Sequence, residues 1–145
     1  MTCTFFGHRD APNKIMPVLQ AALVDLIENK HVDRFYVGNQ GAFDCIVRSS
    51  LEELESEYPH IRYSVVLAYL PQKDTGYDYS HSVYPDGFES APPKYAIVKR
   101  NRWMIDESDY VITYVKCAGG ASKFKELAEK KGKVVINLPD LPEAE

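Results

Sequence analysis

The fold is decided by the stretch Phe35-Tyr36-Val37-Gly38-Asn39-Gln40-Gly41-Ala42-Phe43-Asp44. Its apolar first part is typical of a buried strand, and a helical pattern begins directly after the glycines. A strand that breaks on glycine into a helix leaves unpaired backbone N–H groups and the positive helix end at one spot. Such a spot suits a phosphate or a carboxylate, so Gly38, Asn39 and Gly41 are candidate ligand-binding residues. Alternatively, the glycines only allow a tight turn.

Outward from this stretch, strands and helices alternate along the chain. Apolar runs predict strands over residues 2–6, 34–37, 63–70, 109–115 and 133–138. Apolar residues at helical spacing predict a first helix that follows a possible N-cap at Asn13 and ends near Lys30. The same spacing predicts helices over 41–58, 95–106 and 121–131. Between residues 71 and 93 no period of either kind survives, which is typical of a lid or binding loop, or of an insertion that covers the sheet edge.

This alternation predicts a three-layer α/β fold in which right-handed crossovers connect the strands of a mostly parallel, five-stranded sheet. We expect the strand order 3-2-1-4-5, numbered along the chain. In that order the direction of winding reverses between strands one and four. Ligands of such sheets bind beyond the carboxyl ends of the strands, at the point of reversal.

Length and composition restrict the class of protein. With 145 residues, 45% of them hydrophobic, residues 1–145 are expected to form a single domain. A net charge of -4 argues against general nucleic-acid binding, which needs a basic face. No apolar run is long enough for a signal peptide or a membrane span, so we expect a cytoplasmic protein without membrane partners.

The cysteines Cys3, Cys45 and Cys117 are odd in number, widely spaced and embedded in apolar segments. We therefore expect three buried thiols rather than disulfides or metal ligands. The acidic run on the helix 41–58 is interpreted as a solvated face. The sequence predicts no metal site and no cofactor.

Three predicted strand ends carry glycine beside polar residues. The run Gly7-His8-Arg9 follows strand one, residues 38–44 follow strand two, and residues 117–121 follow strand four. Because the carboxyl ends of parallel strands meet at one edge, these segments are expected to share a crevice. The residues expected to face each other across it are His8, Arg9, Gly119 and Gly120.

An anion in this crevice would be held by backbone N–H groups near Gly119, Gly120 and Ala121, at a helix start where glycine permits close approach. Arg9 and Arg102 are the predicted side-chain clamps, because a guanidinium meets phosphate oxygens two at a time. The alternative for Arg102 is an ordinary basic residue on the surface.

Other side chains keep two interpretations. His8 either bonds a ribose or phosphate or satisfies a loop carbonyl. Asp44 either caps its own helix or accepts a ribose hydroxyl. Trp103 is expected in the core, with stacking on a base as the alternative. The same alternative, against loop anchoring, applies to Tyr77, Tyr79, Tyr84 and Tyr95.

Five motifs follow one another along nearly the whole chain. They are Phe6-Gly7-His8-Arg9, Gly38 with Gly41-Ala42-Phe43-Asp44, Tyr84-Pro85-Asp86-Gly87, Arg100-Asn101-Arg102-Trp103-Met104 with Ser108-Asp109, and Gly119-Gly120-Ala121 with residues 128–132. In this order they resemble the SLOG superfamily of DprA-like and LOG-like Rossmannoid proteins, in particular its small bacterial and phage members of the YoqJ and YpsA type. The resemblance implies a Rossmann-like nucleotide-binding fold whose partner is a nucleotide or phosphoribosyl small molecule.

The resemblance extends more distantly to cytokinin-activating phosphoribohydrolases, which cleave the N-glycosidic bond of a nucleoside monophosphate. Their signature is Pro-Gly-Gly-x-Gly-Thr-x-x-Glu. Residues 118–126 keep two glycines and the final Glu126, but lose the proline, the third glycine and the threonine. Glu126 is therefore either a catalytic carboxylate or an exposed helix residue beside Lys123 and Lys130.

Two functions follow as hypotheses. The first is a module that senses or sequesters a nucleotide or nucleotide-derived molecule. The second is an enzyme that hydrolyses or transfers the ribosyl bond of a nucleotide. In the enzyme, Glu126 and Asp44 would be catalytic, by steadying positive charge on the ribosyl carbon or by orienting water. Related folds often form dimers through their helices, so a homo-oligomer is one of the expected states.

Overall fold

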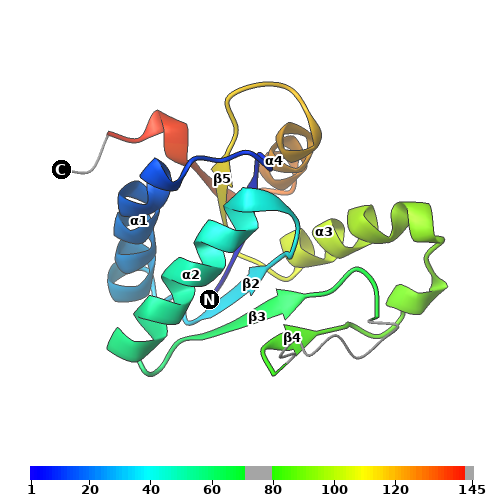
Figure 1. Cartoon of the computed structure of the whole chain (residues 1–145), viewed down its shortest axis with the longest axis horizontal. Coiled ribbons are helices and arrows are strands. Elements are labelled where there is room, and N and C mark those ends of the chain that lie inside the picture. Colours follow the sequence, from blue (N-terminus) through cyan, green and yellow to red (C-terminus); the bar gives the residue numbers. More distant parts are fainter. Residues whose placement is uncertain (71–79, 143–145) are drawn as a thin grey trace.

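A parallel β-sheet forms the middle layer of the computed structural model, which describes residues 1–70 and 80–142 (Figure 1). Its strands within these ranges are β1 (Thr2–Gly7), β2 (Arg34–Val37), β3 (Arg62–Val66), β4 (Ser82–Val83), β5 (Tyr110–Tyr114) and β6 (Val134–Asn137). They lie in the order β4-β3-β2-β1-β5-β6, and each neighbouring pair is parallel. The predicted α/β class with a parallel sheet is confirmed.

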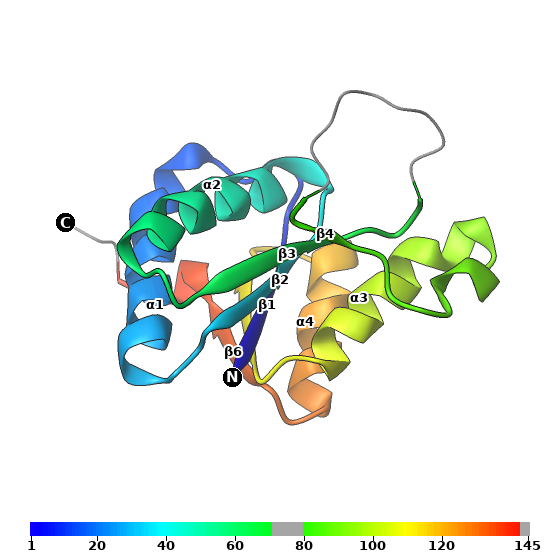
Figure 2. The ribbon, with the colours of Figure 1, turned by 90° about the horizontal axis from the view of Figure 1, so that it is seen from below.

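Helices cover both faces of the sheet. The two helices α1 (Met16–Asn29) and α2 (Gly41–Glu57) lie on one face, and α3 (Ala96–Asp106) and α4 (Gly120–Lys130) lie on the other (Figure 2). Short 3-10 helices occupy Asn13–Ile15, Phe88–Ser90, Pro93–Tyr95 and Leu138–Asp140. Within the described ranges, no helix is both long and apolar enough to cross a membrane.

The prediction of five strands was wrong, because β4 adds a sixth at the sheet edge. This strand pairs Ser82 with Val65 and Val83 with Val66, inside a stretch where the sequence shows no period. Two residues are too few to show a period, so only the tertiary pairing with β3 makes them a strand. The relative order of the other strands is as predicted. The earlier part of this stretch, residues 71–79, lies outside the described residues.

The strand predicted over 63–70 is also shorter than its apolar run. β3 ends at Val66, where its pairing with β4 ends. Leu67 and Ala68 remain buried, whereas Tyr69 and Leu70 are 47% and 57% exposed. The apolar run therefore continues past the last residue that has a strand partner.

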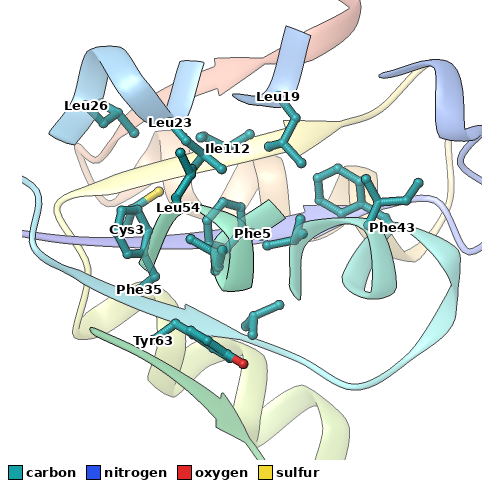
Figure 3. Close-up of a cluster of buried hydrophobic side chains, with 14 of the residues drawn as sticks. Cys3, Phe5, Leu19, Leu23, Leu26, Phe35, Phe43, Leu54, Tyr63 and Ile112 are labelled. Carbon is teal, nitrogen blue, oxygen red and sulfur yellow. The ribbon is translucent and has the colours of Figure 1, made fainter. Parts of the chain in front are cut away.

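The larger core lies between the sheet and the pair α1 and α2 (Figure 3). The continuous apolar sequence of β1 and β2 supplies it, because strands with helices on both faces need apolar residues on both. Phe5 and Phe35 stack with ring centroids 6.1 Å apart, and Leu19 and Leu23 from α1 cover the sheet. This face positions the start of α2 through the fully buried Phe43.

The second core lies under α3 and α4. Phe6 stacks on Phe124 of α4 with centroids 5.4 Å apart, and Met104 of α3 is almost fully buried. Trp103 packs edge-on against Tyr36, with centroids 5.0 Å apart, so it lies against this core. The packing alternative predicted for Trp103 is the observed one.

The cysteine prediction holds only in part. Cys3 is buried in β1, and burial raises the pKa of its thiol far above the ordinary value. Cys45 and Cys117 are exposed, contrary to the prediction. Cys45 falls on the solvent side of α2, between inward-facing neighbours, and Cys117 lies in the loop after β5. All three thiols are free.

Candidate functional site

A cleft of about 280 Å³ opens at the carboxyl edge of the sheet, where α3 and α4 flank the end of β1. The strand order reverses between β1 and β5, so the cleft lies at the switch point of the sheet. Apolar residues form one part of its lining: Phe5, Phe6, Ile97, Met104 and Phe124. The rest of the lining is Gly7, His8, Arg9, Gln40, Asp44, Arg100, Asn101, Gly120 and Ala121.

Arg100 of α3 is the most unusual member of this lining, because it is only 3% exposed. Its Nε donates a hydrogen bond to Asn101 Oδ1 at 3.1 Å, and one terminal nitrogen donates to Asn39 Oδ1 at 3.0 Å. Burial lowers the pKa of Arg100, while the charge of Asp44 raises it. A guanidinium keeps its proton in proteins, so the cleft holds a buried positive charge with N–H donors to spare.

Asp44 in the first turn of α2 is the acidic counterpart. Its carboxylate is 8% exposed and accepts a hydrogen bond from the backbone N–H of Gln40 at 2.9 Å. Burial raises the pKa of Asp44, although this hydrogen bond and the charges of Arg100, Arg48 and Arg9 oppose the rise. The bond to Gln40 matches the capping role among the two predicted for Asp44, and the carboxyl also lines the cleft.

Gly38 separates the two charged groups. A Cβ at this position would lie 2.7 Å from Asp44 Oδ2 and 3.3 Å from the Arg100 guanidinium carbon. Among the described residues, no ion pair within 4.0 Å joins Arg100 to any carboxylate. Gly38 does not line the cleft itself. Because it has no side chain, it leaves room for the Asp44 carboxyl and the Arg100 guanidinium to lie near each other.

The raised pKa of Asp44 predicts a defined pH dependence. Because burial raises the pKa of Asp44 in the folded state, the contribution of this carboxyl to stability is greatest below the ordinary Asp pKa of 3.8 and is lost as pH rises through the raised value. The native protein should therefore lose stability relative to Asp44→Asn over that window, by at most about 1.4 kcal/mol per pH unit. Urea unfolding of both proteins across this pH range measures the difference.

Asp86→Asn, which removes a carboxylate at an exposed position, is the matched control for this titration. A native protein that gains stability over Asp44→Asn as pH rises would show that the Asp44 carboxylate is better stabilised in the fold than in water.

The end of β1 is held by close packing against α2. A Cβ on Gly7 would lie 2.4 Å from the ring of Phe43, so only glycine fits there. Gly41 has a positive φ of 87°, and a Cβ on it would lie 2.9 Å from Arg9 Cα. The N–H of Ala42 donates to the carbonyl of Arg9 at 2.8 Å. These contacts fix the loop that carries Arg9 to the cleft.

His8 is oriented by the neighbouring strand. The backbone N–H of Lys116 donates to His8 Nε2 at 2.8 Å, and the imidazole meets the ring of Tyr114 edge-on with centroids 5.9 Å apart. Because Nε2 accepts this bond, the ring proton of neutral His8 lies on Nδ1. Cys117 Sγ lies 3.8 Å from the same Nε2. His8 thus connects the ends of β1 and β5 and also lines the cleft.

The start of α4 forms another part of the cleft wall. Gly120 and Ala121 line the cleft at the first turn, and Gly119 is the N-cap, with no side-chain hydrogen bond to the helix start. The unpaired N–H groups of a first turn attract anions. A Cβ on Gly119 or Gly120 would meet no atom within 4 Å, so this wall is open to a ligand.

The structure brings together most, but not all, of the predicted site residues. Gly7, His8, Arg9, Asp44, Gly120 and Ala121 line the cleft, whereas Gly38, Asn39, Gly41 and Gly119 contact or adjoin that lining. Arg102 is exposed on α3 and does not line the cleft. Glu126 is exposed on α4 and is also outside the lining, in agreement with the alternative of a surface carboxylate.

Arg100, Asn101 and Gln40 are site residues that the sequence reasoning missed. A signal for one of them was present, because Ala96, Arg100 and Met104 recur every four residues on the buried face of α3. The same spacing places Arg102 on the opposite face. A buried arginine on an apolar helix face is rare without a partner, so the position of Arg100 in this pattern already indicates a site residue.

The tyrosines proposed for base stacking are spread over different surroundings. Tyr84 packs edge-on against Phe88, with centroids 5.7 Å apart, and Tyr95 is 53% exposed with the Lys94 ammonium over its ring. Neither lines the cleft. Tyr77 and Tyr79 lie outside the described residues.

Comparison with known proteins gives no match to a family model and no match to a curated protein sequence. The SLOG resemblance therefore rests on the motifs alone.

Proposed function

We propose that the protein binds a nucleotide or a related phosphoribosyl small molecule in the cleft at the β1–β5 switch point, as a sensing or sequestering module. The observation that carries this proposal is the buried Arg100 guanidinium, which lines the cleft and has no carboxylate at ion-pair distance among the described residues. A buried charge without a direct counter-ion is costly. An anionic ligand in the cleft would remove that cost.

The surroundings favour a phosphate as the anion. The first turn of α4 offers the N–H groups near Gly120 and Ala121, and Arg9 and Arg100 also line the cleft. A guanidinium binds phosphate oxygens through two parallel hydrogen bonds, and a helix start binds them through its backbone. Together these donors suit a phosphate monoester better than a neutral sugar.

The rest of the cleft suits the remainder of a nucleotide. Ile97, Met104 and Phe124 form an apolar wall against which a base can pack, and Asp44 and Asn101 offer polar contacts for ribose hydroxyls. A volume of about 280 Å³ favours a single nucleotide over a dinucleotide. With such a ligand, the chain would agree with the SLOG resemblance in both fold and site.

Replacement of Arg100 is expected to abolish tight binding. Arg100→Met keeps a long apolar side chain but removes the charge and its donors, so nucleoside monophosphate affinity should fall roughly ten- to hundredfold. The matched control is Arg102→Met, which removes the same charge from the exposed face of the same helix. Isothermal titration with a panel of nucleoside 5′-monophosphates and ribose 5-phosphate measures both variants.

Because Arg100 is buried, thermal unfolding of the variant is measured alongside. Arg9→Ala changes an exposed rim residue and gives a second test that does not depend on core packing. The proposal fails if the native protein binds no member of the panel, or if Arg100→Met and Arg9→Ala both bind with native affinity.

A second function, hydrolysis of an N-glycosidic bond, is favoured by one observation. Asp44 is a buried carboxyl that lines the cleft, and a carboxyl at such a position can transfer a proton to a leaving base or orient the attacking water. The exposed Glu126 has no place in such a site.

Turnover distinguishes the two functions. Purified protein is incubated with the nucleoside monophosphate panel, and released base is followed by chromatography. The enzyme predicts base release that Asp44→Asn abolishes and Glu126→Gln leaves unchanged. Binding of a nucleotide without base release favours the sensing module.

A further inference from the structure

A second cleft, of about 260 Å³, lies on the opposite face of the sheet, near the carboxyl end of β5. It is bordered by the 3-10 helix Asn13–Ile15 with the start of α1, and by the 3-10 helix Leu138–Asp140. Its lining is Lys14, Ile15, Pro17, Val18, Tyr114, Lys116, Leu138, Pro139 and Leu141. None of these residues lines the first cleft, although His8 of the first cleft packs against Tyr114 of the second.

Tyr114 supplies the main indication of a ligand. The residue is only 6% exposed, and its ring is held by Phe43, stacked with centroids 6.3 Å apart, and by His8. Its phenol nevertheless makes no hydrogen bond to any residue within 1–70 or 80–142. The Tyr114 hydroxyl is not among the buried side-chain atoms of the described residues that lack a partner, so it is open to water or to a ligand. The side chain lines the second cleft, where an acceptor on a ligand could take the place of that water.

The charged side chains that line this cleft are both positive, and Asp140 of the bordering 3-10 helix does not belong to the lining. Lys14 and Lys116 line it, and no acidic residue belongs to the described lining. The Lys116 ammonium lies 5.7 Å from the centre of the Tyr114 ring, which places a positive charge close to the phenol. Both lysines are exposed, so their long side chains can bring ammonium groups to a ligand at the mouth.

The remaining surface of the cleft is apolar. Ile15 and Leu138 are buried at 7% and 3% exposure, and Val18 and the prolines continue the same surface. A ligand that matches this arrangement has an apolar body and one anionic group. The described lining holds no arginine, so a phosphate would find fewer hydrogen-bond donors here than in the first cleft. Lys14, Tyr114 and Lys116 are enough to bind a carboxylate, which has only two oxygens.

We infer that the cleft between the start of α1 and the 3-10 helix Leu138–Asp140 binds a small apolar monocarboxylate. Its carboxylate accepts a hydrogen bond from the Tyr114 hydroxyl and pairs with the Lys116 and Lys14 ammonium groups. Its aryl or branched alkyl body packs on Ile15, Val18 and Leu138.

Phenylacetate is the probe for this site, and phenylacetamide is its neutral counterpart of nearly the same shape. Titration of the full chain, followed by ¹H–¹⁵N NMR, should place the phenylacetate shifts around Lys14, Tyr114 and Lys116. Tyr114→Phe should weaken phenylacetate binding roughly tenfold, since a hydrogen bond to a charged group is lost. Lys116→Gln should weaken it as well, whereas Lys123→Gln, an exposed lysine on α4, should not.

Two further readouts separate binding in this cleft from binding elsewhere on the protein. Tyr114→Phe should unfold at the native temperature or above, because the hydroxyl it removes has no partner among the described residues; a clear loss of stability overturns the inference. Arg100→Met should bind phenylacetate as well as the native protein does. The inference is also overturned if phenylacetamide or inorganic phosphate binds as tightly as phenylacetate, or if phenylacetate does not bind.

Discussion

Phe43→Ala is expected to lower the free energy of unfolding by about 3–5 kcal/mol, the cost typical of deleting a fully buried phenylalanine. Phe43 is 0% exposed at the start of α2, where it stacks on Tyr114 and covers Gly7. Its loss leaves a cavity between α2 and the end of β1, because the pairing of β1 with β2 and β5 holds the backbone of β1 in place. Urea denaturation of the native protein and the variant measures the change.

The same ring decides the effect of a substitution at Gly7. In the native protein Gly7→Ala places a Cβ 2.4 Å from the Phe43 ring, and overpacking of this kind costs about 1–3 kcal/mol. In the Phe43→Ala background the new methyl group has room, so the added cost should largely disappear. The two substitutions are therefore expected to be strongly non-additive.

Gly120→Ala is the control for this double-mutant cycle, because its Cβ would meet no atom within 4 Å. Its effect should be the same in both backgrounds. Equal costs of Gly7→Ala with and without the Phe43 ring would show that the close approach of β1 and α2 does not exist in solution.

Gly41→Ala is the second substitution with a large expected effect, and Gly87→Ala is matched to it. The two glycines have nearly the same φ, 87° and 88°, so alanine is strained to a similar degree at both, by about 1–2 kcal/mol. A Cβ on Gly41 also lies 2.9 Å from Arg9 Cα, whereas a Cβ on Gly87 meets nothing within 4 Å. Gly41→Ala should therefore cost about 1–3 kcal/mol more.

The clash at Gly41 should also weaken ligand binding. Its relief moves the Arg9 backbone and weakens the bond from the Ala42 N–H to the Arg9 carbonyl. Nucleotide affinity should fall in Gly41→Ala and stay native in Gly87→Ala, as measured by titration of the folded proteins. Equal losses of stability in Gly41→Ala and Gly87→Ala would contradict this prediction, because the Arg9 loop would then move away from the new methyl group at no cost in free energy.

Much of this fold was predictable because its signals are local. The apolar runs of β1 and β2 and the helical spacing in α1 and α2 each lie within a few residues. The alternation of these elements restricts the topology to parallel winding. The meeting of the ends of β1 and β2 at one edge followed from the same rule, and Gly7, His8 and Arg9 do line a cleft there.

Features that depend on distant partners were not predictable in the same way. β4 is a strand only because β3 lies beside it, and β3 stops where that partner stops. Cys117 lies in an apolar-looking segment but emerges at an exposed rim. Whether such a residue is buried depends on segments that are distant in the sequence, so its sequence neighbours do not predict its burial.

The arginines of α3 show what local sequence predicts and what it does not. Helical spacing already separates Arg100, on the buried face, from the exposed Arg102. That Arg100 meets Asn39 from the end of β2 and approaches Asp44 of α2 follows only from packing, because these residues are more than fifty positions away along the chain.

The sequence by itself therefore determines the α/β architecture and the edge of the sheet at which the polar site residues lie. Both follow from hydrophobic periodicity and from short turns. The residues that surround the Arg100 guanidinium in one cleft, and the position of the Tyr114 phenol in the other, are decided by tertiary packing. Burial, charge separation and the supply of hydrogen-bond partners are properties of surfaces that meet across the sheet, and no local segment of sequence contains both surfaces.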